Sequence, residues 1–466
     1  MFEQKSLLPV LTVAFPFLMT LAIFIWGRVS AKLRNYLSIL AAIGTFALSL
    51  TMVSGSLKGT IFVYKLMQIV PGIWFYFRVD QLGLVFAVTA SLLWVLSVTY
   101  SVSYMEDEHA QRRYFCFLIL CLTWTLGVAL SGNLFTFFIF YELFSISTYP
   151  LIVHEESPEA LAAGKKYMIY ILIGAAFVLF SLVFTYVLAG DLTFNKAGLM
   201  SMEMGRDKLM VLFWTFVLGF GVKAAIMPMH GWVPDAHPIA PAPFIAILSG
   251  IMVGMGCFGL MRSVFNIIGA SIVKELGTGL ILAYIVCFTI IVSSLLALEQ
   301  DNLKRRLAYS TIGQMGYVIL GVALLVPYSV WGGILHVVNH AFMKGLLFLC
   351  AGTIIKKLGK KNVSEMRGIG QKLPVTMGVF TIAAFSMIGL PPLAGFTSKW
   401  FLCLGSIDAP HGIIFVIVLL ISSLLGAAYF LPIIYTAFFQ KPLGEIETRH
   451  EDEEAKESYR QKPEAS

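Results

Sequence analysis

The sequence predicts an all-α polytopic membrane protein with about thirteen transmembrane helices. Hydrophobic residues make up 58% of its 466 residues, only 13% are charged, and the mean hydropathy is +0.84. These values are typical of a chain that crosses a bilayer many times, and they exclude a soluble protein with one large core. Apolar runs of about 20 residues, the length of a membrane-spanning helix, recur with short loops between them.

The predicted spans follow one another closely along the chain. They lie at residues 7–27, 35–55, 81–103, 114–131, 133–153, 167–189, 209–227, 241–262, 276–298, 306–326, 331–355, 374–405 and 412–439. The first is a full span without a small-residue cleavage site, which argues against a signal peptide. Residues 1–439 therefore form one transmembrane domain. Residues 440–466 are charged and contain proline, which predicts a disordered tail.

The distribution of lysine and arginine predicts the orientation. With the N-terminus outside, the inner loops and the tail carry 21 of the 33 Lys and Arg residues and the outer loops carry nine. The remaining three, Lys223, Lys344 and Lys399, lie within spans. Positive residues favour the cytoplasmic side. Because the predicted number of spans is odd, the tail is then cytoplasmic.

Two of the spans are interrupted. The seventh runs into Pro228, and the twelfth contains Gly389 followed by two prolines. Proline breaks a helix, and a broken helix at membrane depth needs protein or water to satisfy its freed carbonyls. In two sets of five helices, residues 114–262 and 276–439, the broken helix is the fourth of each set, and the second set is inverted. Matched breaks in inverted halves indicate a transport site; two unrelated proline kinks are the alternative.

One carboxylate and one amine lie deep in the first half. Glu142 lies near the middle of the fifth span, and no residue on the flanking turns neutralises it. Lys223, the only lysine within a span of that half, is its predicted partner. A close pair attracts by about 4 kcal/mol at an effective dielectric near ~20, so a pair that opens and closes acts as a proton valve. A static structural ion pair is the alternative.

The stretch Trp331–Gly352 is apolar enough to cross a bilayer, yet it carries His336, His340 and Lys344. Their spacing of four and four places all three on one helical face. An ionisable group inside a membrane costs about 3 kcal/mol or more unless it is paired or hydrated. The stripe therefore predicts a polar, hydrated partner surface. A packed helix with satisfied histidines is the alternative.

Three more ionisable residues are candidates for the same pathway. Lys399 has no carboxylate nearby in its own half, so it is predicted to accept protons at the far end of a chain; snorkelling to the interface is the alternative. His230 and His237 lie in the Pro-rich segment MPMHGWVPDAHPIAPAP. Each either shuttles protons or is simply solvated. Asp235 is expected to be a turn or cap residue, and Asp80 to occupy a helix N-terminus.

Several classes of site are not predicted. The six cysteines lie in apolar runs and form no CxxC pair, so neither a metal site, an iron–sulfur cluster nor a disulfide framework is expected. The chain carries no dinucleotide-binding fingerprint, so no cofactor and no catalytic residue is predicted. No basic stripe with exposed aromatics indicates nucleic acid.

Five stretches together carry a family resemblance over roughly residues 80–405. They are FIFYELFSI around Glu142, KAAIMPMHGWVPDAH from Lys223, LKRRLAYSTIGQMGY, HVVNHAFMKGLLFL from His336, and SMIGLPPLAGFTSKW up to Lys399. The chain resembles the antiporter-like membrane subunits of respiratory complex I, Mrp-type cation/proton antiporters and membrane-bound hydrogenases. The resemblance implies that Glu142 and Lys223 are the proton-valve pair. It implies that His336, His340 and Lys399 complete a charged axis, with Lys344 also matching the motif.

The sequence departs from that pattern in two places. The family's eighth helix usually carries a lysine where this chain has Gly254, so the axis is either interrupted or bridged by water and His336. The family commonly has fourteen helices, and this chain is predicted to have thirteen. Lysine at position 399 and the lack of a long lateral helix resemble the Mrp and hydrogenase branch of the family.

The resemblance implies a proton-translocating subunit of a multisubunit respiratory, hydrogenase or Mrp-type complex, with Na⁺/H⁺ exchange left open. Its expected partners are other membrane subunits, H⁺, Na⁺ and the lipid bilayer of a bacterial or archaeal cell membrane. Any oxidoreductase activity is expected to reside in partner subunits. A stand-alone cation/proton antiporter and a non-conducting scaffold subunit are the alternatives.

Overall fold

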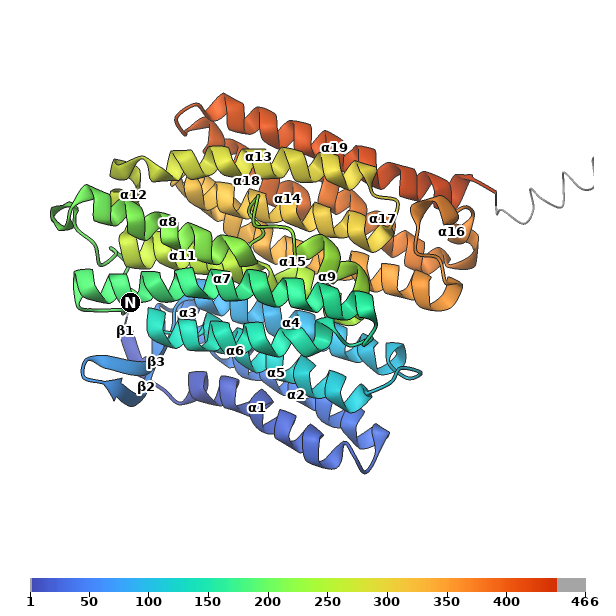
Figure 1. The fold of residues 1–466 in the computed structure, drawn as a ribbon, viewed down its shortest axis with the longest axis horizontal. Helices are drawn as coiled ribbons and strands as arrows, with labels where there is room; N and C mark the ends of the chain where they lie inside the picture. The colour runs from blue at the N-terminus through green and yellow to red at the C-terminus, as the bar shows by residue number, and fades with distance from the viewer. Residues whose placement is uncertain (1, 442–466) are drawn as a thin grey trace, which may run out of the picture.

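The computed structural model describes residues 2–441, so most of the predicted tail lies outside the described residues. The described chain is a bundle of roughly parallel helices with a small sheet at one end (Figure 1). The elements before residue 270 are β1 Phe2–Lys5, α1 Leu8–Trp26, α2 Ala31–Thr51, α3 Val53–Leu57, β2 Thr60–Val70, β3 Ile73–Val79, α4 Gln81–Tyr104, α5 Gln111–Ala129, α6 Leu134–Ile152, α7 Pro158–Ala189, η1 Met202–Met204, α8 Arg206–Lys223, α9 Val233–Ile239, α10 Ala242–Ile247, η2 Leu248–Met252, α11 Gly254–Arg262 and η3 Ser263–Ile268.

The named elements of the second half of the described chain are all helices. Its elements are α12 Ala270–Leu276, α13 Thr278–Glu299, α14 Leu303–Ala323, α15 Pro327–Leu358, η4 Val363–Glu365, α16 Ile369–Lys372, α17 Pro374–Ile388, α18 Ala394–Ile407 and α19 Gly412–Phe439. The predicted all-α polytopic class is confirmed. Each expected span coincides with one helix or with one interrupted helix of the structure.

Ten helices of the described chain are long and apolar enough to cross a membrane. The other expected spans, at 209–227, 306–326 and 374–405, correspond to α8, α14 and the pair α17–α18. Helices α8 and α14 carry several charges in their first turns, and α17 and α18 are each too short to cross alone. The total of thirteen spans therefore stays a prediction.

The sheet is the element that the sequence analysis missed. Strands β2 and β3 pair antiparallel across the turn Pro71–Gly72, and β1 adds to β2 in parallel. Aromatic and β-branched residues around a Pro-Gly turn favour a hairpin, because Gly72, at φ +85°, adopts the left-handed conformation without a Cβ clash. The sheet lies beside the N-terminal ends of α1 and α4, at the end of the bundle where the chain starts (Figure 1).

Both predicted helix breaks are present. Helix α8 ends at Lys223 and the chain resumes as α9 at Val233, whereas α17 ends at Ile388 and α18 begins at Ala394. The two breaks run in opposite directions: α8 lies toward the sheet end and α9 away from it, while α17 lies away from the sheet and α18 toward it (Figure 1). This arrangement supports the inverted relation between residues 114–262 and 276–439, which stays a prediction for the repeats as a whole.

The expected eighth span is a helix of mixed geometry. Two π-helical turns, η2 and η3, flank α11, and all of its residues from Ala242 to Ile268 are buried or nearly so. Such turns are frequent at functional sites. At the C-terminal end of α11, Arg262 makes a two-pronged ion pair with Asp80, the N-cap of α4, with N–O distances of 2.5 and 2.8 Å. The pair ties the centre of the bundle to α4.

Three consecutive cations at the start of α14 hold the opposite end of the bundle. Lys304 donates to the carbonyls of Pro238 and Ala240 at the end of α9, at 3.2 and 3.1 Å. Arg305 lies 3.5 Å from Asp235 of α9, and Arg306 donates to the carbonyl of Tyr429 on α19. Helix α14 is therefore the element that joins the first break to the second half.

Candidate functional site

Lys223 lies at the end of α8 with no exposed surface. Its Nζ donates to Ser145 Oγ at 2.7 Å and to the hydroxyl of Tyr167 at 3.5 Å. The ring centroid of Phe144 is 4.1 Å from the same nitrogen. Hydroxyl and aromatic partners, rather than a carboxylate, therefore surround this amine.

Glu142 is half-buried on α6, one turn before Ser145. Its Oε1 is buried and has no hydrogen-bond partner among the described residues. Glu142 and Lys223 form no ion pair in the described chain, although their charges lie close enough to act on each other. The predicted pair is thus seen in an open arrangement, with Ser145 holding the amine and one carboxylate oxygen unsatisfied.

The two histidines after the first break differ in their surroundings. His230 is half-buried, its Nδ1 has no partner among the described residues, and its ring lies 6.5 Å from that of Tyr309 on α14. His237 is wholly buried on α9 between Trp232 and Phe348. Neither ring nitrogen of His237 has a partner within residues 2–441, so of the two it is the better placed inside the bundle.

His336 on α15 is wholly buried, with both ring nitrogens engaged. Its Nε2 is 2.8 Å from Gln314 Oε1 on α14, and its Nδ1 is 2.9 Å from Ser398 Oγ on α18. A neutral imidazole with its hydrogen on Nε2 satisfies both contacts, because it donates to Gln314 and accepts from Ser398. This tautomer is assigned from the hydrogen-bond network.

The hydroxyl of Ser398 has a second acceptor within reach. Its Oγ also lies 3.2 Å from the carbonyl oxygen of Gly395. When the serine hydrogen turns to that carbonyl, Nδ1 of His336 is free to take a proton and donate back to Ser398 Oγ. The site therefore accommodates both protonation states of His336 without leaving a polar atom unpaired.

His340 and Lys344 continue the same face of α15. His340 Nε2 lies 3.2 Å from the carbonyl oxygen of Ser249 in the π-helical η2, and its Nδ1 has no partner in the described chain. Lys344 Nζ likewise has no partner there, and the ring of Phe430 is centred 6.0 Å away from it. Unsatisfied buried polar groups are costly, by about 1–3 kcal/mol each, and this favours bridging water.

Lys399 shows the opposite pattern. Its Nζ donates to the carbonyls of Met387 and Ile388 at 2.8 and 3.0 Å, and to Ser423 Oγ at 3.1 Å. Those carbonyls are the freed acceptors at the end of α17, where the helix dipole favours a cation. Lys399 therefore points into the break and is buried, rather than snorkelling to the interface.

Gly254 lies on α11 against α15. An added Cβ would have one neighbour within 4 Å, Val337 Cγ1 at 3.8 Å, which is ordinary van der Waals contact. Val337 follows His336 directly. The glycine is therefore not required for tight packing.

Sequence reasoning found the ionisable residues but missed the neutral groups that hold them. These are Ser145, Tyr167, Gln314, Ser398 and Ser423. Single hydroxyl and amide residues are common in apolar helices, so they gave no signal. Asp235 lies in the first turn of α9, as expected of a cap-like residue, but it also forms an ion pair with Lys166 at 2.5 Å, which the sequence did not indicate.

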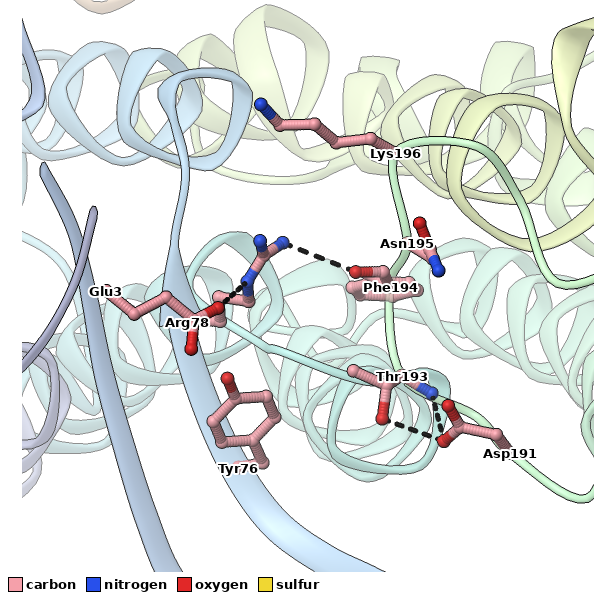
Figure 2. A pocket seen from close by; sticks show the side chains of 8 residues that line it. All are labelled: Glu3, Tyr76, Arg78, Asp191, Thr193, Phe194, Asn195 and Lys196. Atoms are coloured by element: carbon pink, nitrogen blue, oxygen red, sulfur yellow. Dashed lines mark hydrogen bonds and ion pairs between the residues drawn. The ribbon is translucent and has the colours of Figure 1, made fainter. Parts of the chain in front are cut away.

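A polar cavity of about 340 Å³ lies apart from these residues, beside the sheet. Figure 2 shows its walls, formed by Glu3, β3 and the loop 191–196. Arg78 is held there by Glu3 and by the carbonyl of Phe194, both at 3.3 Å, and Asp191 accepts three hydrogen bonds from its own loop. Its charged groups thus largely satisfy one another.

Residues 131–426 match the family model described as NADH:quinone oxidoreductase/Mrp antiporter, TM, which covers more than half of the chain. The chain belongs to this family. Residues 72–115 also match the model described as NADH-Ubiquinone oxidoreductase (complex I), chain 5 N-terminus. Membership of the NADH:quinone oxidoreductase/Mrp antiporter family confirms the resemblance. With its apolar helices, this chain is a multi-pass integral membrane protein.

Similar proteins extend over nearly the whole chain. The NADH-quinone oxidoreductase subunit N of Desulforudis audaxviator (strain MP104C) is 31% identical over 437 residues, which cover 93% of this chain and 87% of that protein. A chain of the archaeal membrane-bound sulfane sulfur reductase has the same fold, with a TM-score of 0.85, 23% identity, and 94% and 90% of the two chains covered. A chain of the Mrp complex from Dietzia sp. DQ12-45-1b has the same fold, with a TM-score of 0.83 and 24% identity. The match covers 94% of this chain and 81% of that chain.

Proposed function

We propose that this chain translocates protons across the membrane as one subunit of a larger complex. The observation that carries the proposal is the set of buried ionisable residues at and between the two helix breaks. They are Glu142, Lys223, His237, His336, His340, Lys344 and Lys399. Burying this many ionisable groups within a membrane domain costs free energy, and such groups mark proton or ion pathways in membrane proteins. The relatives support a subunit role, since their names describe a subunit of an oxidoreductase and parts of an archaeal respiratory membrane complex and an Mrp complex.

Each half of the molecule supplies an amine at its break, and the two amines differ in their partners. Lys223 has hydroxyl partners and a nearby carboxylate that it does not contact, whereas Lys399 is bound to three oxygens. Closing the gap between Glu142 and Lys223 stabilises both charges, by about 4 kcal/mol near contact. Opening it favours the neutral forms, in which the lysine gives up one proton and the carboxylate takes up one from the other side of the pair. This alternation is the valve that the proposal requires.

The residues of α15 carry the proton between the breaks. His336 accommodates both protonation states through Ser398, and His340, Lys344 and His237 each hold a buried nitrogen without a partner among the described residues. Water that bridges these nitrogens makes the path continuous. His230 joins the set at its edge, on the side of the first break.

Gly254 bears on the scaffold alternative. Tight apolar packing at this position would favour a subunit that does not conduct protons. A Cβ added at Gly254 would instead meet only Val337, at ordinary contact distance. The room for a Cβ at Gly254 supports a water-bridged path in place of the lysine that the family usually carries. The proposal includes exchange of protons for Na⁺ and membership of a respiratory, hydrogenase or Mrp-type complex, both of which need their own experiments.

The test is proton uptake in vesicles that contain the native complex at matched subunit levels. Glu142→Gln and Lys399→Ala should abolish uptake while the complex still assembles. The exposed Glu275→Gln on α12 is the matched control and should transport normally. Uptake at the wild-type rate in Glu142→Gln would refute the valve.

Subunit identification by mass spectrometry of the purified complex tests the partner part of the proposal. Purification of the chain alone, in a form that still transports in liposomes, would support the stand-alone antiporter instead.

A further inference from the structure

Tyr317 on α14 is buried in the second half, and none of the roles described above uses it. It has no exposed surface, and its hydroxyl has no hydrogen-bond partner among the described residues. Other buried tyrosines are satisfied: the hydroxyl of Tyr114 lies 3.0 Å from Ser101 and that of Tyr429 lies 2.9 Å from Ser310. An unsatisfied buried hydroxyl calls for an explanation beyond packing.

The ring of Tyr317 stands between two members of the buried ionisable set. Its centroid is 5.3 Å from that of the His336 imidazole, and the two planes meet at 85°. Lys399 Nζ lies 5.0 Å from the same centroid, within cation–π range. His336 belongs to α15 and Lys399 to α18, so the ring of Tyr317 on α14 contacts residues of both helices.

The neighbouring serines of α19 complete the arrangement. An ammonium has three hydrogens, and Lys399 directs two to the carbonyls of Met387 and Ile388 and the third to Ser423 Oγ. If the amine loses one proton, two hydrogens remain for the two carbonyls, so the proton that leaves is the one shared with Ser423. Ser422 and Ser423 act electrostatically on the Tyr317 hydroxyl, but neither forms a hydrogen bond with it.

We propose that Tyr317 is a further residue of the proton path, which relays protons between Lys399 and His336. This inference rests on the proposed function. A proton passes from the Lys399 ammonium to Ser423 Oγ, and the hydrogen of Ser423 passes through a bridging water to the Tyr317 oxygen. The hydrogen of Tyr317 passes through a second bridging water to Ser398 Oγ, and the hydrogen of Ser398 passes to Nδ1 of His336. One proton leaves the lysine, one arrives on the imidazole, and all three hydroxyls end neutral.

Tyr317→Phe tests the relay because it keeps the ring and removes only the hydroxyl. Proton uptake by the native complex in vesicles should fall by about tenfold or more, as expected for loss of a positioned proton-transfer group. Tyr429→Phe is the matched control: it removes an equally buried hydroxyl that is already bound to Ser310 and should leave uptake within about twofold. Subunit content and the melting temperature of the complex should be similar in both variants.

If Tyr317→Phe does not assemble, a second pair of variants tests the relay. Ser423→Ala removes the next hydroxyl of the relay and should slow uptake, whereas Ser310→Ala removes a buried hydroxyl bound to Tyr429 and should not. Wild-type uptake in Tyr317→Phe or in Ser423→Ala overturns the relay. If Lys399→Ala, measured alongside, is inactive in that case, the proposed function stands; if Lys399→Ala transports normally, the proposed function itself fails.

Discussion

The three lysines within the predicted spans differ in how far their amines are satisfied. Lys399 has three oxygen partners, Lys223 has two hydroxyls, and Lys344 has none among the described residues. Burying an ammonium without partners costs several kcal/mol. The three amines therefore differ in the cost of holding a proton, and this is what a stepwise path between them needs.

Lys399→Arg separates fixed charge from proton release. Arginine can donate to the carbonyls at the end of α17, but it stays protonated at any accessible pH. The variant should assemble normally and lose proton uptake. The measurement is uptake in vesicles beside wild type, with subunit levels compared on the same samples. Full uptake would mean that Lys399 supplies only a fixed charge to the helix end.

His154 is a buried titratable group outside the spans, just beyond the end of α6. Its ring stacks on His109 at 4.8 Å and meets Tyr114 edge-on at 5.5 Å, and neither ring nitrogen has a partner in the described chain. Burial, then the positive charges of Arg113 and His109, lower the pKa of His154 from 6.5 to about 4, against a smaller opposing effect of Glu156. The native state therefore holds this imidazole neutral.

The stability of the protein should accordingly fall in acid. Between pH 6.5 and about 4 the unfolded chain binds more protons at His154 than the native chain, so this contribution is complete above pH 6.5 and is lost as the pH falls. His154→Phe keeps the aromatic contacts and removes the titration. Melting temperatures in detergent at about pH 7.5 and about pH 5 should differ less in the variant than in wild type. Equal differences would exclude a role for His154.

At the scale of elements, the second break depends on how closely α18 approaches α17. A Cβ at Gly395 would lie 1.8 Å from the Ser386 carbonyl oxygen, which no small movement can relieve. Gly395→Ala should therefore destabilise the protein by about 1–3 kcal/mol or more and disturb the carbonyls that hold Lys399. The control is Gly378→Ala on α17, where an added Cβ meets nothing within 4 Å.

The paired alanine variants are compared by thermal melting in detergent. Gly378→Ala should be neutral or stabilising by up to about 1 kcal/mol, because alanine favours the helix. Equal melting temperatures for the two variants would show that α18 can move away from α17 at little cost.

The elements also show what the sequence could predict. Helix positions followed from apolar runs, and both breaks followed from Pro228, Pro391 and Pro392, because these are local signals. The hairpin of β2 and β3 was not predicted, although its Pro-Gly turn is a local signal, because its strands are apolar like the neighbouring spans. The π-helical turns around α11 could not be predicted, because no local residue pattern marks them; η2 packs against α15 and η3 against α8.

The site was predictable in its charges but not in its contacts. Ionisable residues stand out in apolar spans, so Glu142, Lys223 and Lys399 could be named from the sequence alone. Their partners could not, because a hydrogen bond such as that from Lys223 to Ser145 joins residues 78 positions apart. The open arrangement of Glu142 and Lys223 depends on that contact, and it changes the predicted ion pair into a pair that must move to close.

At the scale of the whole molecule, the two ends of the described chain lie at opposite ends of the bundle. Phe2 is at the sheet end, and α19 finishes at the other end (Figure 1). This agrees with an odd number of crossings, and the orientation expected from loop charge stays a prediction. The predicted cytoplasmic end carries Asp235, Lys304 and Arg305.

Cysteine labelling tests this orientation. The native cysteines are buried, apart from the half-buried Cys403, so introduced cysteines at exposed positions should dominate labelling. Lys58→Cys, near the sheet, should react in intact cells with an impermeant maleimide, and Glu108→Cys, between α4 and α5, should react only after permeabilisation. The reverse pattern would invert the assigned topology.

The turn at Gly277 has a consequence for the unity of the polypeptide. Its φ of +74° closes α12, and no atom lies within 4 Å of a Cβ there, so a break in the chain at this turn would remove no packed side chain. Helices α14 and α15 meanwhile pack on α9, α10 and α4 across the divide. The two halves are thus held together by an interface between helices as well as by the polypeptide link. Residues 1–277 and 278–466, co-expressed as separate chains, should therefore copurify through a tag on either one, and recovery of the tagged chain alone would show that the fusion is essential.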